Sequence, residues 1–254
     1  MNRPPSEETP KIRLFVTADL EAGAPVRLET EQAHYLSHVM RMRPGDEVAL
    51  FNARHGEWRA RIEGFGKRQC DLVATAMTRA QRAEPDLWLL FAPIKRTRVD
   101  FLVEKATELG VSVLWPVFTR FTDATRVTTD RLRAIAIEAS EQPERLTTPE
   151  IRTPQRLERV FDDWPVTRRL LVGDETGGGR PVAEALAALP PGPAAVFVGP
   201  EGGFAKSELD EMRDLPFVTT VGLGPRILRA DTAALAALAC WQALRGDWRE
   251  DSAL

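Results

Sequence analysis

Apolar and polar residues alternate along the first third of the chain, as they do in half-buried β-strands. Trp58, Ala60 and Ile62 alternate with Arg59 and Arg61. Further strand-like runs lie at residues 12–16, 47–51 and 70–75, and the apolar positions between 34 and 40 suit a short helix. The pattern predicts a small β-rich barrel over residues 11–82. It follows a polar, proline-containing tail at residues 1–10 that is expected to be disordered.

The pattern changes after residues 83–86, which are expected to link two domains. From there, short apolar runs alternate with helix-like segments. The runs lie at residues 87–92, 111–117, 169–172, 195–198 and 217–221. The clearest helix is 98–109, in which Val99, Leu102 and Ala106 share one face. Alternating strands and helices predict an α/β domain with a parallel sheet over residues 83–248.

Two of the predicted strands end in loops that contain glycine. Gly199-Pro200-Glu201-Gly202-Gly203 follows the run at 195–198, and residues 222–229 follow the run at 217–221. Ligands of open α/β sheets bind at the carboxyl ends of the strands, and glycine lets the backbone approach a ligand closely. The paired loops therefore indicate a ligand site. The first loop taken alone is more typical of an ordinary strand-to-helix turn.

Composition narrows the class of protein. The chain has 254 residues, 43% of them hydrophobic, which is ordinary for a globular protein with a real core. It has no apolar run of about 18 residues and no secretory signal pattern, so a cytoplasmic location is expected. Cys70 and Cys240 lie far apart and suggest two reduced thiols rather than a metal site.

Basic residues gather in the predicted barrel, although the net charge of the chain is −3. The net charge argues against indiscriminate coating of nucleic acid but not against a local basic face. The residues concerned are Arg41, Arg43, Arg54, Arg59, Arg61, Lys67 and Arg68. They form either a solvated surface or a face that contacts phosphates.

Several segments resemble one family. GPEGGF at 199–204 and LGPRILRADT at 223–232 resemble the C-terminal signature of the RsmE-type 16S ribosomal RNA uridine N3-methyltransferases. KATELGV at 105–111 and the pattern from His34 through Arg41 to Gly45-Asp46 also match. The resemblance implies a SPOUT-class α/β domain with a deep trefoil knot, preceded by a PUA-like RNA-binding barrel. It also implies a homodimer that uses S-adenosylmethionine, without a metal, to methylate a uridine in the small ribosomal subunit.

The resemblance also implies roles for individual residues. The expected cofactor-binding residues are Val172, Gly199, Pro200, Glu201, Gly202, Leu223, Gly224, Leu228 and Thr232. The expected RNA-binding residues are Arg41, Arg43, Arg59, Lys95, Arg98 and Arg120. The expected catalytic residues are Arg145, Arg229 and Asp231.

Two routes could handle the N3 proton of the uracil. A carboxylate of Glu141, Glu201 or Asp231 could act as general base. Alternatively, Arg145 or Arg229 could stabilise the negative charge that develops on the carbonyl oxygens. Stabilisation by arginine is the favoured hypothesis.

The chain departs from the family pattern in three places. Residues 141–145 read EQPER instead of EQCGR, Asp231 stands where the family has Glu, and Ala205 stands where a serine caps the next helix. Ser207 is the alternative cap. The open alternatives are a different RNA target, an RNA-binding assembly factor that has lost its chemistry, and an unrelated nucleotide-binding enzyme. The absence of G-x-G-x-x-G after an early strand argues against a dinucleotide site.

Overall fold

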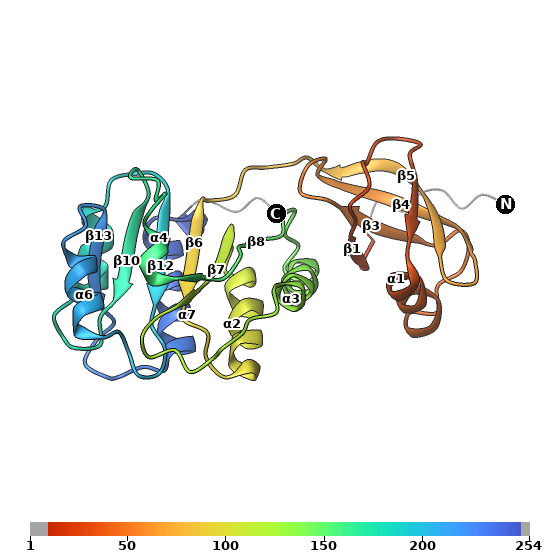
Figure 1. Ribbon diagram of the computed structural model, residues 1–254. Helices are drawn as coiled ribbons and strands as arrows, with labels where there is room; N and C mark the ends of the chain where they lie inside the picture. The colour runs from red at the N-terminus through yellow and green to blue at the C-terminus, as the bar shows by residue number, and fades with distance from the viewer. Residues whose placement is uncertain (1–9, 250–254) are drawn as a thin grey trace. The chain divides into compact units, whose positions relative to one another are not determined.

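The computed structural model describes residues 10–249, so the expected disordered tail lies almost wholly outside the described residues. The chain divides into two compact units, and Figure 1 follows it through both. The first unit comprises the chain up to Ala83 together with Ser140–Thr148, and the second comprises Glu84–Ala139 and the chain from Pro149 onward. The sequence-based division assigns residues 140–148 to the later domain, whereas their contacts group them with the first unit.

A five-stranded sheet forms the body of the first unit. Its strands are β1 (Arg13–Phe15), β2 (Pro25–Leu28), β3 (Glu47–Phe51), β4 (Glu57–Phe65) and β5 (Cys70–Arg79). Their order is β1-β3-β4-β5-β2, and every neighbouring pair is antiparallel except β1 and β3. Trp58, Ala60 and Ile62 are buried, which confirms the predicted half-buried strand.

The short helix of the first unit begins earlier than predicted. Helix α1 spans Thr30–His34, and the chain then continues as one π-helical turn, Tyr35–Val39. The wider turn leaves Tyr35, Val39 and Met40 exposed and buries Leu36. Single π-helical turns of this kind are frequent at functional sites.

An all-parallel sheet forms the second unit, as predicted. Its strands are β6 (Leu87–Phe91), β7 (Val113–Phe118), β8 (Glu150–Ile151), β9 (Gln155–Arg156), β10 (Arg169–Gly173), β11 (Arg180–Pro181), β12 (Ala194–Val198) and β13 (Val218–Gly222). The main order is β11-β13-β10-β12-β6-β7-β8, and β9 pairs with β7. The helices are α2 (Arg96–Glu108), α3 (Thr129–Glu141), α4 (Leu157–Val160), α5 (Val182–Ala188), α6 (Lys206–Arg213) and α7 (Ala230–Leu244), followed by a 3-10 turn, Asp247–Arg249.

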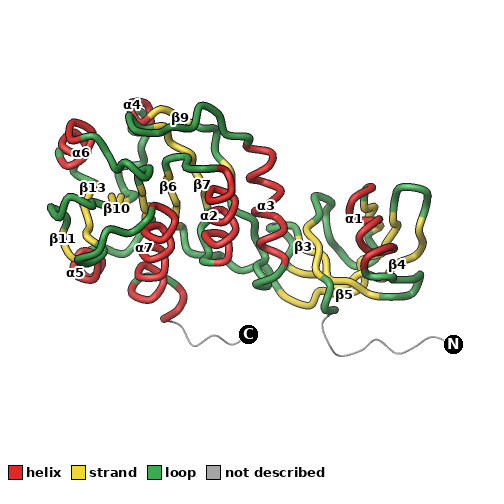
Figure 2. Tube along the Cα trace, turned by 90° about the horizontal axis from the view of Figure 1, so that it is seen from below, coloured by secondary structure: helices red, strands yellow, loops and turns green. Residues whose placement is uncertain are grey.

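Successive residues of the central strands face two different helical layers. Leu89 and Phe91 pack in a core shared with α2, α5 and α7, whereas Trp88 and Leu90 pack in a core shared with α4 and α6. Figure 2 shows α4 and α6 on one side of the strands and α5 and α7 on the other. Because both faces are covered, the strands read as continuous apolar runs rather than as alternating ones.

The start of α6 corrects one detail of the sequence reading. The helix begins at Lys206 with Ala205 as its N-cap, so Ser207 is not the cap. Glu208 Oε2 accepts a hydrogen bond from the Ala205 backbone N at 2.8 Å. The alanine has no side-chain acceptor, so one half of the usual capping pair is missing at a cost of about 0.5–2 kcal/mol.

None of the helices within residues 10–249 is long and apolar enough to cross a membrane.

Candidate functional site

A cavity of about 400 Å³ opens at the carboxyl edge of the parallel sheet. It lies where β10, β12 and β13 end, and the loop that follows each strand forms one wall. The lining residues are 173–177, 198–201, 203, 221–230 and 233. Both glycine-bearing loops singled out in the sequence therefore border one cavity, together with a third loop after β10.

Glycines occupy positions in these loops where a side chain would clash or where the backbone is left-handed. Gly203 has φ +70° and lies directly beneath the Glu175 carboxylate, where a Cβ would collide with it. Gly199 is packed against the Phe204 ring, which a Cβ would approach to 3.1 Å. Gly224 has φ +98°, a conformation that side-chain-bearing residues rarely adopt. The glycines thus fix the shape of the loops that carry the cavity.

Asp174 organises the loop after β10. Its buried carboxylate accepts hydrogen bonds from Thr176 N at 2.9 Å, Thr176 Oγ1 at 2.6 Å and Arg213 Nη2 at 2.7 Å. Burial opposes ionisation, but the donors outweigh it, and the pKa of Asp174 lies below its ordinary value. Asp174 is therefore an ionised structural anchor that ties the loop to α6, and it is poorly suited to accept a proton.

The cavity combines apolar walls with charged groups. Val198, Val221, Leu223 and Leu228 are among the apolar lining residues. Glu175 and Glu201 supply carboxylates, and Arg226 and Arg229 supply guanidinium groups. All four of these charged residues are exposed to solvent.

The expected cofactor residues fall into two groups. Gly199, Pro200, Glu201, Leu223, Gly224 and Leu228 line the cavity. Val172, Gly202 and Thr232 do not. Val172 is fully buried within β10, Gly202 packs against Phe121, and the backbone N of Thr232 donates to Asp231 Oδ1 at 2.9 Å.

The three expected catalytic residues lie in different settings. Arg229 lines the cavity at the N-cap of α7. Asp231, in the first turn of α7, forms an ion pair with Arg98 at 3.5 Å. Arg145 belongs to the first unit, where it is buried and donates from Nη2 to Thr147 Oγ1 at 3.0 Å.

A buried clamp in the first unit holds the segment that carries Arg145. Arg13 pairs with Glu57 at 2.6 Å and donates to the backbone oxygens of Ser140, Glu141 and Arg145 at 3.2, 2.7 and 2.7 Å. Glu141 Oε1 accepts a hydrogen bond from the Phe15 backbone N at 3.0 Å. The Glu141 carboxylate, one of the candidate bases, is therefore engaged with β1.

The expected RNA-binding residues also differ in their surroundings. Arg41 and Arg43 are exposed after the π-helical turn, and Lys95 and Arg120 are exposed in the second unit. Arg59 is largely buried and lies 3.7 Å from the Glu47 carboxylate, and Arg98 is the partner of Asp231. The sequence reading missed Asp174 and its partner Arg213, the Glu175 carboxylate over Gly203, and the exposed Phe121 beside Gly202.

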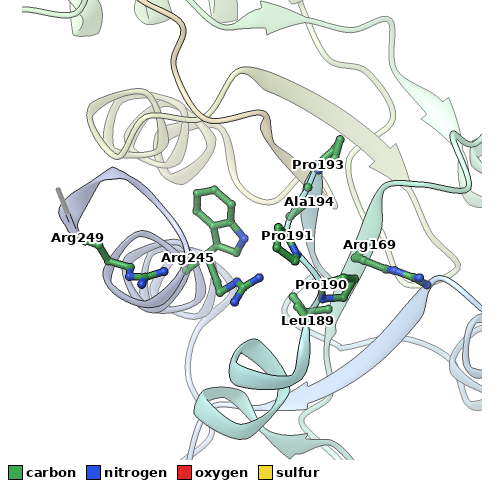
Figure 3. A pocket seen from close by; sticks show the side chains of 10 residues that line it. Arg169, Leu189, Pro190, Pro191, Pro193, Ala194, Arg245 and Arg249 are labelled. Atoms are coloured by element: carbon green, nitrogen blue, oxygen red, sulfur yellow. The ribbon is translucent and has the colours of Figure 1, made fainter.

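A second cavity of about 190 Å³ lies at the opposite edge of the sheet, where β10 and β12 begin. Figure 3 shows Arg245 and Arg249 on one side of Pro190 and Pro191, with Arg169 on the other. It is smaller, and it lies at the edge where parallel sheets do not usually bind ligands. The cavity at the carboxyl edge is therefore the candidate site.

Within the described residues, no group of three or more His, Cys, Asp or Glu side chains is placed to hold a metal ion.

Comparison with known families supports the resemblance seen in the sequence. Residues 82–242 match the model of an RNA methyltransferase domain, and residues 28–75 match the model of an RNA methyltransferase PUA domain. The chain is similar to the ribosomal RNA small subunit methyltransferases E of Rickettsia conorii and Synechocystis. It is 29% identical to the first over 89% of this chain and 93% of the relative, and 31% identical to the second over 91% and 77%.

Solved structures of methyltransferases are also similar to this chain. A ribosomal RNA small subunit methyltransferase E from Neisseria gonorrhoeae, bound to S-adenosylmethionine, superposes with a TM-score of 0.82 at 26% identity, covering 93% of this chain and 99% of its own. A putative methyltransferase from Legionella pneumophila, also with bound cofactor, gives 0.84 at 28% identity, covering 94% and 99%. The expected class, a SPOUT α/β domain preceded by a PUA-like domain, is confirmed, while the deep knot stays a prediction. The chain belongs to the RNA methyltransferase family that includes the ribosomal RNA small subunit methyltransferases E.

Proposed function

We propose that this chain transfers a methyl group from S-adenosylmethionine to N3 of a uridine in 16S ribosomal RNA, within the small ribosomal subunit. The observation that carries the proposal is the cavity bordered by both signature loops at the carboxyl ends of β12 and β13. The relatives are named for methylation of small-subunit RNA, and the Neisseria relative holds the cofactor.

The residues of the cavity fit the chemistry of the cofactor. Val198, Leu223 and Leu228 offer an apolar surface of the kind an adenine ring occupies, with backbone groups of the same loops beside them. Glu175 and Glu201 offer carboxylates to the ammonium group or the ribose hydroxyls. When bound, the sulfonium centre supplies an already activated methyl group. The task left to the chain is to hold the donor, aim it and favour loss of the N3 proton.

Arg229 is the best placed group to favour that proton loss. It lines the cavity, is exposed, and has no ion pair within the described part of the chain. A guanidinium facing the uracil carbonyl oxygens would stabilise the negative charge that develops there. Asp231 is the weaker candidate because its carboxylate is held by Arg98 at 3.5 Å, which suits a role in positioning the start of α7.

The exposed basic residues fit a role in holding RNA. Arg41 and Arg43 would contact phosphates from the first unit, and Lys95 and Arg120 would do so from the second. Arg59, Arg98 and Arg145 each have a protein partner, which fits indirect roles through neighbouring residues better than direct contact. We also infer that the chain acts as a homodimer in the cytoplasm, where small subunits are assembled.

The test uses labelled S-adenosylmethionine and small ribosomal subunits from a strain that lacks the modification. Digestion followed by nucleoside analysis should find the label in 3-methyluridine. Arg229→Ala should reduce transfer at least about 100-fold, the usual scale for losing a group that stabilises charge in the transition state, while cofactor binding persists. Arg159→Ala removes an exposed arginine of α4 that lines neither cavity and should leave the rate unchanged.

Other outcomes would redirect the assignment. Label in a different nucleoside would retain the methyltransferase and discard the uridine target. No label and no cofactor binding would favour an RNA-binding assembly factor, with the altered residues 141–145 as the first place to look.

A further inference from the structure

A rigid turn follows β7 in the second unit. Thr122 N donates to Thr119 O at 3.1 Å, Thr119 N donates to Thr122 Oγ1 at 2.9 Å, and the two hydroxyls lie 3.0 Å apart. The two threonines close the turn, and Arg120 and Phe121 are its central residues. Backbone and side-chain bonds together hold these two residues in one arrangement.

The turn is attached to helix α6 and to the GPEGG loop that precedes this helix. Arg120 N donates to Glu208 Oε1 at 2.8 Å, and the same carboxylate accepts from Ala205 N. The Phe121 Cβ lies 3.4 Å from the position that a Cβ on Gly202 would take. Gly202 stands between Glu201 and Gly203, which both line the cavity. Phe121 therefore stands beside the rim of the cavity.

The chain's own packing leaves the large apolar side chain of Phe121 exposed. Its side chain is 47% exposed, and it belongs to none of the buried clusters formed by the described residues. Arg120 is exposed and has no ion pair within residues 10–249. An aromatic residue and an arginine without an ion pair thus occupy adjacent positions at the tip of a fixed turn.

We propose that Phe121 stacks on a base of the RNA strand that carries the target uridine, and that Arg120 contacts the adjoining phosphate. The inference rests on the proposed function. Single-stranded RNA is recognised largely by stacking of unpaired bases on aromatic rings, and arginine positions the backbone. A nucleotide taken out of its stack to reach a buried site loses stacking energy, which a ring at the rim can replace.

The charge of Asp123 affects how much of the RNA affinity comes from stacking on Phe121 and how much from phosphate binding by Arg120. Asp123 follows immediately and is exposed, so the turn carries no net charge, although Arg120 and Asp123 form no ion pair with each other. Stacking then supplies most of the affinity, and salt affects it little. A second copy of this chain is the rival occupant, but an arginine without an ion pair next to the aromatic residue suits a phosphate-bearing strand better.

The test compares Phe121→Ala, Phe121→Leu and Phe121→Trp in binding and methylation of unmodified small ribosomal subunits. Loss of one base–aromatic contact should weaken binding about tenfold. The alanine variant should show this loss, leucine should recover part of it, and tryptophan should match or exceed the original. Affinity for S-adenosylmethionine should stay unchanged. Phe101→Ala removes a phenylalanine of similar exposure, 44%, on α2 and serves as the matched control.

Two measurements separate this inference from the proposed function. Small-subunit RNA that contains 4-thiouridine should cross-link to the peptide with Phe121, whether or not transfer occurs. If the unaltered chain transfers no methyl group, the proposed function fails while the cross-link still tests the contact. Unchanged RNA affinity in Phe121→Ala, an equal loss in Phe101→Ala, or a changed oligomeric state with unchanged RNA binding would overturn the inference.

Discussion

At the scale of single residues, Asp174 shows how the site is held in shape. Its carboxylate has no exposed surface, and it joins the loop after β10 to Arg213 of α6 at 2.7 Å. Arg213 has a second partner, Asp210, at 3.2 Å, but the Asp210 side chain is 52% exposed. The two carboxylates therefore share one guanidinium in very different surroundings, and they form a matched pair for mutation.

Asp174→Asn should lower the free energy of unfolding by about 2 kcal/mol at pH 7, because hydrogen bonds to a buried charged group are lost. Asp210→Asn should lower it by less than about 1 kcal/mol, as expected for an exposed pair. Since the pKa of Asp174 is depressed in the folded state, its contribution is complete above its unfolded pKa of about 3.9 and is lost as the pH falls through the folded value.

Urea unfolding at pH 7 and at about pH 3 measures this prediction. The difference between the unaltered chain and Asp174→Asn should be largest at neutral pH and should shrink in acid. A difference that is constant with pH would show that the carboxylate charge contributes nothing.

Residues whose role depends on a partner far along the chain cannot be predicted from the sequence. The glycines of both signature loops could be placed at the site because the chain itself shows them after apolar runs. Asp174 and Phe121 could not, since their importance comes from Arg213 and Gly202, which lie far along the chain. A local pattern carries no signal for such pairings.

At the scale of elements, the strands of the parallel sheet were predictable, and the grouping of residues 140–148 with the first unit was not. Buried parallel strands appear as continuous apolar runs, and the predicted runs match β6, β7, β10, β12 and β13 to within one or two residues at each end. Residues 140–148 follow the barrel because Arg13, more than 120 positions earlier, binds their carbonyl oxygens. No period in the sequence reports a contact across that distance.

Arg13→Met should lower the free energy of unfolding by about 3–5 kcal/mol, because it leaves the fully buried Glu57 carboxylate without its closest cation. Arg27→Met is the control: Arg27 and Asp71 lie 2.7 Å apart in the same sheet, but both are exposed, so the loss should be far smaller than for Arg13→Met. Urea unfolding of both variants measures the two losses of unfolding free energy. Equal losses in the two variants would contradict the buried clamp.

At the scale of the whole molecule, each unit has its own core, and the candidate site lies in the second unit. The site was foreseeable at this scale because three parallel strands end at one edge, whichever helices cover their faces. The deep knot and the homodimer follow only from the resemblance. The homodimer can be tested through α7, whose inner face holds Ala234, Leu238 and Trp241.

Helix α7 leaves apolar surface uncovered at its end. Leu244 is 42% exposed and Trp248, in the turn that follows, is 56% exposed. If a second copy covers this surface, sedimentation equilibrium should give the mass of two chains. Leu244→Asp should then shift the chain towards the monomer, because a charge at an apolar interface must be desolvated without a partner.

Met77 provides the control for that measurement. It is 51% exposed on β5, so Met77→Asp introduces the same charge at a similar exposure in the other unit. It should leave the mass unchanged. A monomeric mass for the unaltered chain at micromolar concentration would contradict an interface formed by α7. Equal dissociation of both variants would contradict it as well. The candidate site would then have to be completed by the residues of one chain alone.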